Sequence, residues 1–167
     1  VSAELVSERL LVAACRSVVE AIDDVDHAGL IMNDNAPDDG LVVAEYPATG
    51  SIGSRLMLRG YPVFEQMQIT KEPVVINDVA NAEVLLGPNY QVLLDNGIRS
   101  LMIVPLIAQN EFLGSLGLDS KAMTHHFTAA EVEFASTIAG QIAISMYNAQ
   151  LFEQLDARTI ELGEDNR

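Results

Sequence analysis

The chain has 167 residues, 49% of them hydrophobic, which is enough for one substantial core and short for two ordinary domains. Its 24 acidic and 9 basic side chains give a formal net charge of −15, so its surface repels the phosphates of nucleic acids and of anionic lipids. The longest apolar run, residues 101–108, is much shorter than the roughly 20 residues that a membrane-spanning helix needs. We therefore expect one acidic domain that contacts neither nucleic acid nor membrane.

The start of the chain and its cysteine content bear on the cellular compartment. The first residue is Val1, no secretory leader follows it, and Cys15 is the only cysteine. This pattern predicts a piece cut from the interior of a cytoplasmic protein. Cys15 lies near the apolar side of the first expected helix, where its ordinary role is that of a small packing residue.

The first part of the chain predicts one helix and three strands. Apolar residues recur at steps of three and four over residues 5–22, as in an amphipathic helix. Residues 28–32 and 41–46 predict two strands joined by the polar, turn-rich residues 33–40. Apolar and long polar side chains alternate over residues 55–59, which predicts a third strand with one solvated face.

The middle of the chain predicts short elements. Pro62 fits the first turn of a helix that runs to about Thr70. Residues 74–76 predict a brief buried strand, and residues 77–87 predict a loop. A short helix over residues 89–95 should then be closed by Gly97 in the left-handed conformation.

Residues 101–107 and 112–118 predict a hairpin, because two apolar runs flank a tight polar connection at residues 109–111. Strict alternation in the second strand places two sets of side chains on opposite faces. The first set is Phe112, Gly114, Leu116 and Leu118, and the second is Leu113, Ser115 and Gly117. The small residues would allow close packing.

A long helix should begin at Thr128, which forms a capping box with Glu131, while Phe127 and Val132 complete a hydrophobic staple. The apolar pattern thins beyond Asn148, so the helix is expected to outlast the domain. Residues at alternating steps of three and four along it predict a coiled-coil seam with polar interruptions. The seam residues are Ile144, Asn148, Leu151, Leu155, Arg158 and Leu162.

This order of elements predicts an α+β fold, an antiparallel sheet with helices packed on it. The sequence also resembles GAF domains, most strongly over residues 97–106 and 112–118, with residues 75–79 upstream and 127–131 downstream in the expected order. The resemblance implies a GAF/PAS-like six-stranded antiparallel sheet with helices packed on one face and a ligand-type cavity on the other. It also implies frequent dimerisation through the terminal helices.

The resemblance covers most of the chain and suggests how it is divided. Residues 1–155 would be the GAF domain, and residues 156–167 the start of a helical linker to a covalently linked output domain. Residues 143–155 resemble the helix by which GAF domains pass into such modules, and residues 158–162 are similar to linkers before histidine-kinase or further sensory domains.

The resemblance also implies where a ligand would bind. The family's cavity is roofed by the segment between the strand end at Asn77 and the turn at Gly97. The polar residues there or beside it, our candidate ligand-binding residues, are Asp78, Tyr90, Arg99 and Ser100. Asp78 could instead cap the following turn, and Arg99 could pair with Asp95 or another surface carboxylate. For the signal helix, the candidates are Thr128, Glu131, Ile144, Leu151 and Leu155.

Relatives that bind cyclic nucleotides carry an Asn-Lys pair, a Phe and paired acids. Here the corresponding residues are Ser120-Lys121, Phe127 and Glu131-Val132, so only part of the pattern is present. Helix capping already explains the last two, and the structural interpretation is therefore preferred. A Lys121 to Glu131 ion pair would be compatible with either interpretation.

Other chemistry known in the family finds little support. Reduction of methionine sulfoxide and covalent bilin attachment both need cysteine at the cavity, and Cys15 is placed inside the first helix. No bilin is expected and haem is not favoured, although His27 is the lesser candidate for a cavity histidine. His125 and His126 are adjacent, which makes joint metal binding awkward, and the simplest interpretation is a solvated turn.

The leading hypothesis is a non-catalytic sensory module of a cytoplasmic signalling protein, with a sensor histidine kinase as the favoured parent. A small ligand of unknown identity would change the packing around the cavity and shift the exit helix. The alternative is a ligand-free dimerisation and signal-relay module whose cavity is filled by its own side chains. An enzyme is the third hypothesis, and the sequence offers no nucleophile with a base, no phosphate-binding glycine motif and no zinc-ligand spacing for it.

Overall fold

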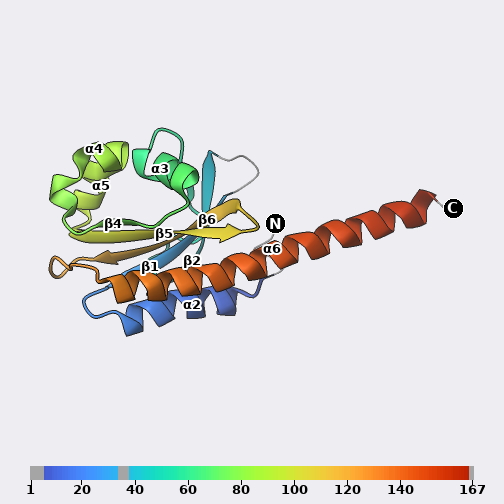
Figure 1. Ribbon diagram of the computed structural model, residues 1–167, viewed down its shortest axis with the longest axis horizontal. Coiled ribbons are helices and arrows are strands. Elements are labelled where there is room, and N and C mark those ends of the chain that lie inside the picture. Colours follow the sequence, from blue (N-terminus) through green and yellow to red (C-terminus); the bar gives the residue numbers. More distant parts are fainter. Residues whose placement is uncertain (1–5, 34–37, 166–167) are drawn as a thin grey trace.

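An antiparallel sheet of six strands, in the order β3-β2-β1-β6-β5-β4, forms the centre of the computed structural model (Figure 1). The structure describes residues 6–33 and 38–165. The strands are β1 (His27–Asn33), β2 (Asp39–Tyr46), β3 (Arg55–Met57), β4 (Val74–Ile76), β5 (Ser100–Ala108) and β6 (Glu111–Ser120). The helices are α2 (Glu8–Ala21), α3 (Pro62–Thr70), α4 (Glu83–Leu86), α5 (Tyr90–Asp95) and α6 (Ala129–Asp165), with 3-10 turns η1 (Val79–Asn81) and η2 (Gly87–Asn89). The α+β fold and the six-stranded sheet are confirmed.

One face of the sheet is covered by α2 and α6, which lie side by side (Figure 1). The spacing of Leu11, Cys15 and Val18 places all three on the buried side of α2, as the amphipathic pattern predicts. They pack with alternate residues of β1, β5 and β6 and with α6 residues down to Met146 to form the first core. The helix starts at Glu8, and the part of the expected helix before Val6 lies outside the described residues.

The other face carries α3, α4 and α5, so helices cover both faces and not one (Figure 1). Between these helices and strands β4 and β5 lies a second core. Its fully buried or nearly buried members include Phe64, Met67, Val79, Leu86 and Ile103. The expected loop over residues 77–87 contains η1 and α4, because its apolar residues Val79 and Leu86 turn inward onto this core.

The hairpin of β5 and β6 turns at Gln109 and Asn110, which both have positive φ, as a tight hairpin connection requires. The expected facing of its second strand is wrong at two residues. Leu106 pairs with Gly114 but Ile107 pairs with Phe112, so Leu113 is an extra residue in a β-bulge. Leu113 therefore joins the first core, and Phe112 packs on the second.

The edge strand β3 is shorter than predicted, and all three of its residues are exposed. The solvated face predicted for this strand is thus not matched by a buried one, and the strand forms one edge of the sheet. Leu58, just after the strand, is the residue that enters the core. The turn-rich segment between β1 and β2 was predicted at residues 33–40, and its residues 34–37 lie outside the described residues.

The long helix α6 begins as predicted. Thr128 N donates to Glu131 Oε1 at 2.8 Å and Glu131 N donates to Thr128 Oγ1 at 3.1 Å, which is the capping box. Phe127 and Val132 both pack against the first core. Beyond Ala149 no residue of α6 belongs to either core, and the helix projects away from the domain to Asp165 (Figure 1).

Candidate functional site

A groove of about 790 Å³ lies beside β4, the strand at one edge of the sheet. It is lined by Pro62 at the start of α3 and by residues 75–78 and 80–85, which run from β4 through η1 into α4. Apolar side chains predominate in its wall, and Asp78 and Glu83 add two carboxylates. None of these described lining residues is Lys, Arg or His. The groove therefore offers an apolar surface with negative charge.

Asp78 and Tyr90, two of the predicted ligand residues, both hold η1 in place. Asp78 Oδ1 accepts a hydrogen bond from Ala80 N at 3.2 Å, and its Oδ2 accepts one from Asn81 Nδ2 at 2.6 Å. Asp78 is thus the N-cap of η1, the structural role considered for it from the sequence. Tyr90 Oη donates to Ala80 O at 2.7 Å. Asp78 lines the groove, whereas Tyr90 does not.

Arg99, the third candidate, is exposed and lines a second hollow of about 210 Å³ together with Asp78. The structure brings these two candidates together outside the groove proper. The ion pair considered between Arg99 and Asp95 is not formed among the described residues, because Asp95 Oδ1 accepts from Gln91 Nε2 at 2.9 Å. Arg99 therefore keeps its guanidinium at the surface.

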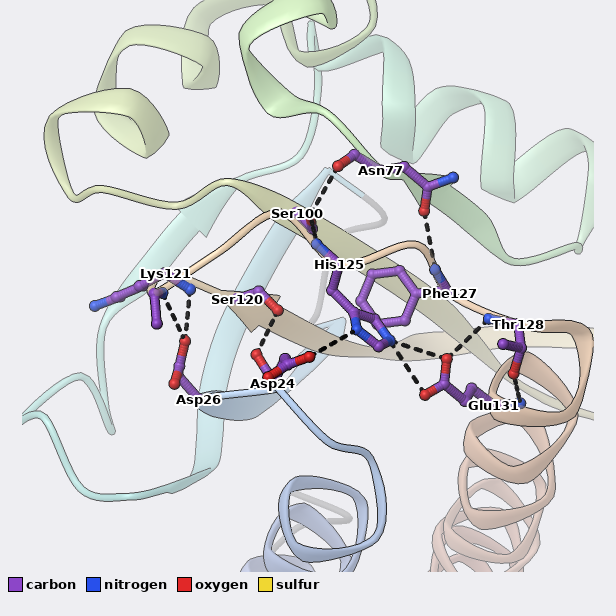
Figure 2. Close-up of polar contacts among 11 residues, drawn as sticks. Asp24, Asp26, Asn77, Ser100, Ser120, Lys121, His125, Phe127, Thr128 and Glu131 are labelled. Atoms are coloured by element: carbon purple, nitrogen blue, oxygen red, sulfur yellow. Dashed lines mark hydrogen bonds and ion pairs between the residues drawn. The ribbon is translucent and has the colours of Figure 1, made fainter.

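Ser100, the fourth candidate, is fully buried, and its hydroxyl forms two hydrogen bonds (Figure 2). Ser100 Oγ donates to Asn77 O at 2.7 Å and accepts from His125 N at 2.8 Å. It joins the end of β4 to the segment that precedes α6. Its side chain lines neither the groove nor the second hollow.

Asn77 is a residue that the sequence did not single out as a candidate. Asn77 lines the groove, and its Oδ1 accepts a hydrogen bond from Phe127 N at 3.1 Å (Figure 2). A polar residue directly after a buried strand, beside the expected cavity roof, was the signal available in the sequence. Its partner Phe127 lies 50 residues further along the chain, which no local pattern reveals.

His125 is the centre of a polar cluster at the start of α6, and the expectation of a solvated turn is wrong for it. Its side chain is 13% exposed, and its Nε2 lies 2.9 Å from Glu131 Oε1 (Figure 2). Its Nδ1 lies 3.6 Å from Asp24 Oδ2, in the turn after α2. The Lys121 to Glu131 ion pair is not formed among the described residues, because His125 and Thr128 occupy this carboxylate.

The environment of Glu131 favours its charged form. Burial alone would raise the pKa of this carboxyl, but hydrogen bonds from Thr128 N and His125 outweigh burial and lower the pKa. The carboxylate also lies at the amino terminus of α6, where the helix dipole favours negative charge. Glu131 is thus ionised while it ties His125 to the helix.

A second histidine cluster lies at one end of β1, β2 and β6. His27 Nε2 lies 2.8 Å from Glu45 Oε1, and His27 Nδ1 lies 3.4 Å from Asp119 Oδ2. The hydrogen bond that His27 donates to Asp119 raises the pKa of His27 most, and the one that it donates to Glu45 adds to this against the effect of burial. Burial would raise the pKa of Glu45, yet hydrogen bonds from Thr49, His27 and Ser51 lower it to about 2. Ion pairs in this cluster therefore connect β1 with β2 and with β6.

The remaining features that could carry chemistry are Cys15, a metal-binding cluster and a membrane-spanning helix. Cys15 is fully buried, and burial raises the pKa of its thiol to about 12, so it is a packing residue as expected. Among the described residues, no group of three or more His, Cys, Asp or Glu side chains is arranged to hold a metal ion. Over the same ranges, none of the helices combines the length and apolarity needed to cross a bilayer.

The predicted seam on α6 is exposed to solvent in this single chain. Ile144 is 57% exposed, Leu151 40% and Leu155 64%. Phe152, which the seam did not include, is 70% exposed beside them. Apolar side chains in such a row are normally covered by a partner.

Comparison with known proteins places the chain in a family. The family model of the GAF domain matches residues 8–146. The blue-light absorbing form of the PixJ GAF domain of Thermosynechococcus elongatus has a TM-score of 0.75 at 18% identity, over 95% of this chain and 95% of that chain. The GAF domain from a phosphoenolpyruvate-protein phosphotransferase of Coxiella burnetii has a TM-score of 0.72 at 23% identity, over 88% of this chain and 86% of that chain.

A domain of a protein named as a two-component sensor histidine kinase of Sinorhizobium meliloti 1021 has a TM-score of 0.65 at 22% identity, over 92% of this chain and 98% of that chain. No curated protein matches the sequence significantly. At these identities the solved structures establish the fold, and the family model establishes the kinship. This chain is a GAF domain.

Proposed function

We propose that this GAF domain is the non-catalytic sensory module of a cytoplasmic signalling protein, that a small molecule binds in its groove, and that α6 relays the change to an output domain. The observation that carries the proposal is the course of α6. The helix starts beside the segment bonded to the groove wall and continues without a break from Ala129 to Asp165. A rigid element that joins a groove to a free end is suited to relay.

The free part of α6 supports pairing with a second copy. Residues 150–165 extend about 24 Å beyond the core, at 1.5 Å of rise per residue. An isolated helix of this length is only marginally stable in water. Its apolar residues Leu151, Phe152 and Leu155 would remain exposed to solvent. A parallel or antiparallel partner helix would bury them and stabilise the helix.

Pairing is tested by sedimentation of the chain and of two variants at tens of micromolar concentration. The chain should be a dimer, and the double variant Leu151→Asp with Leu155→Asp should be a monomer. Gln154→Asp is the matched control, because Gln154 is exposed on the same helix but outside the seam. A monomeric parent chain would contradict the relay through paired helices.

The charge of the groove limits the ligand. Asp78 and Glu83 line it without a cationic side chain among its described lining residues, and the whole chain carries a net charge of −15. A phosphate or carboxylate ligand would have no counter-charge there. We therefore expect an uncharged or cationic ligand with apolar surface, and no binding of cyclic nucleotides.

Ligand binding is tested by a thermal-shift screen of uncharged, cationic and anionic metabolites. A ligand present at about 100 times its Kd should stabilise the domain by about 2.7 kcal/mol. The shift should weaken in Val84→Trp, which adds a bulky ring at the wall of the groove, and persist in Val92→Trp on α5 outside the groove. A screen without any hit would remove the support for ligand sensing.

One observation favours the alternative, a ligand-free dimerisation and relay module. The space between the sheet and α3 to α5 is filled by side chains such as Phe64 and Met67, which are 6% and 0% exposed. In this case the dimer would form, the seam variants would break it, and the ligand screen would stay empty. The two proposals thus differ in one measurement only.

The histidine-kinase parent rests on similarity. The protein of Sinorhizobium meliloti that shares this fold is named as a two-component sensor histidine kinase. A long exit helix with an apolar seam is what a dimeric output domain would need at its entry. Fusion of the chain to a histidine-kinase core tests this, since phosphorylation should then depend on the seam residues Leu151 and Leu155.

A further inference from the structure

Asn77 is the one residue of the groove wall that also bonds directly to the segment before α6. Asn77 lines the groove, its Oδ1 accepts from Phe127 N at 3.1 Å, and its backbone oxygen accepts from Ser100 Oγ at 2.7 Å (Figure 2). The other polar residues of the wall bond within η1 or have no such link. Asn77 therefore stands between the groove and the helix.

Two routes of hydrogen bonds lead from Asn77 to the first turn of α6. The short route runs through Phe127 N, next to the N-cap Thr128. The longer route runs through Ser100 Oγ to His125 N, and the ring of His125 then contacts Glu131 at 2.9 Å. Both routes end on the capping box.

A contact between the aromatic rings of Phe127 and His125 connects the two routes. The rings of His125 and Phe127 meet edge to face with centroids 4.8 Å apart. Phe127 also packs against the first core. A shift of the Phe127 backbone therefore moves His125 and its carboxylate partner as well.

We propose that Asn77 is the positioning residue that couples the groove to α6. A ligand in the groove that hydrogen-bonds the Asn77 amide would rotate it, draw Oδ1 from Phe127 N and loosen the capping box. Figure 2 shows the amide nitrogen directed away from Phe127, so the amide has a donor to offer on its other side. This inference rests on the proposed function for its ligand, but the coupling itself is a property of the chain.

The coupling is tested by residue-resolved amide hydrogen exchange of the whole chain. Asn77→Ala removes the acceptor, and exchange at Phe127 and over residues 128–132 should become about threefold to tenfold faster, the size expected for one lost hydrogen bond. Exchange in β6 should not change. Asn77→Asp keeps an acceptor and should restore the slow rates, which also shows that position 77 tolerates substitution.

Asn81→Ala is the matched control, because Asn81 lines the same groove but bonds only to Asp78. It should leave exchange at the start of α6 unchanged. A merely local cap at Asn77 would speed exchange at Phe127 alone, and a general loss of stability would speed β6 too. Either result would overturn the coupling.

The opposite direction is tested with a covalent probe. Val84→Cys places an accessible thiol at the wall of the groove, and N-ethylmaleimide, which is uncharged and carries two carbonyl acceptors, labels it while buried Cys15 stays unreactive. The label should speed exchange over residues 128–132, and this effect should disappear when Asn77→Ala is added. An equal effect in both backgrounds would show that Asn77 does not carry it.

These experiments separate two kinds of failure. If no metabolite binds but the label acts through Asn77, the coupling holds and the ligand part of the proposed function falls. If ligands bind in the groove while Asn77→Ala leaves residues 128–132 unchanged, sensing holds and Asn77 is not its route.

Discussion

Replacement of Glu45 by Gln tests the charge network at the end of the sheet. Glu45 is 3% exposed and accepts hydrogen bonds from His27 Nε2 at 2.8 Å and from Thr49 N and Ser51 N at 2.9 Å each. It therefore joins β1, β2 and the loop that follows β2. Glu45→Gln keeps the shape and one acceptor oxygen but removes the charge that faces His27.

The magnitude follows from the pKa of Glu45. Its hydrogen bonds lower the pKa from 4.5 to about 2, although burial acts against them. At 1.36 kcal/mol for each pKa unit, the ionised carboxylate contributes about 3 kcal/mol to stability at neutral pH. Because the folded pKa is the lower one, this contribution is fully present above pH 4.5 and is lost as the pH falls towards 2.

The assay is urea denaturation of the chain and of Glu45→Gln between pH 3 and pH 7. We expect the variant to be less stable by about 1 to 3 kcal/mol at pH 7, since Gln retains part of the hydrogen bonding. The difference should shrink steadily below pH 4.5. Glu133→Gln, an exposed substitution on α6, is the control and should change stability by less than about 0.5 kcal/mol. A difference at pH 7 that persists undiminished at pH 3 would refute the electrostatic explanation.

Three further predictions concern stability. The pKa of His27 is raised, so its contribution is present below about pH 6.5 and is lost as the pH rises through the folded pKa; His27→Gln should cost more at pH 6 than at pH 9 in denaturation experiments. Thr128→Ala removes the N-cap of α6 and should lower the free energy of unfolding by about 1 kcal/mol, with helix fraying visible in hydrogen exchange. A Cβ at Gly114 would meet Ile31 O at 2.2 Å, so Gly114→Ala should destabilise by more than about 2 kcal/mol, whereas Gly117→Ala, with nothing within 4 Å, should be close to neutral.

Local signals in the sequence predicted the elements that depend on near neighbours in the chain. The capping box joins residues three apart, and the helix after Pro62 starts at the proline itself. Gly97 has the positive φ that the end of a helix favours. These features are correct because their energy comes from contacts within a few residues.

The bulge at Leu113 could not be predicted from the alternation of side chains along the strand. Alternation alone places Phe112 with Leu116 and Leu118, and one extra residue reverses the two sides. The reason is the partner strand, where Ile107 pairs with Phe112 and its neighbour Leu106 with Gly114. The hydrophobicity of Leu113 and Phe112 is equally compatible with either core, so no composition rule detects the change.

The polar clusters escaped prediction for the same reason. His27 and Glu45 are 18 residues apart in the chain and lie on neighbouring strands, and Asn77 and Phe127 are 50 apart. The sheet order brings the first pair together, and the packing of the segment before α6 against the end of β4 brings the second pair together. The ligand roles of Asp78, Tyr90, Arg99 and Ser100 stay predictions, while the structure shows that the Ser100 hydroxyl is already used inside the fold.

The start of α6 sets the size of any signal that the domain can transmit. The bonds at this point, from Phe127 N to Asn77 and within the capping box, contribute about 1 kcal/mol each in net terms. Two or three such bonds fall in the range of 1 to 3 kcal/mol that is typical of coupling between sites. The first core holds α6 through Ala139, Ile142 and Met146, so the loss of these bonds loosens the first turn but leaves the helix docked. A change in the groove should therefore appear first as fraying of the first turn of α6, while the docked middle of the helix keeps the domain folded.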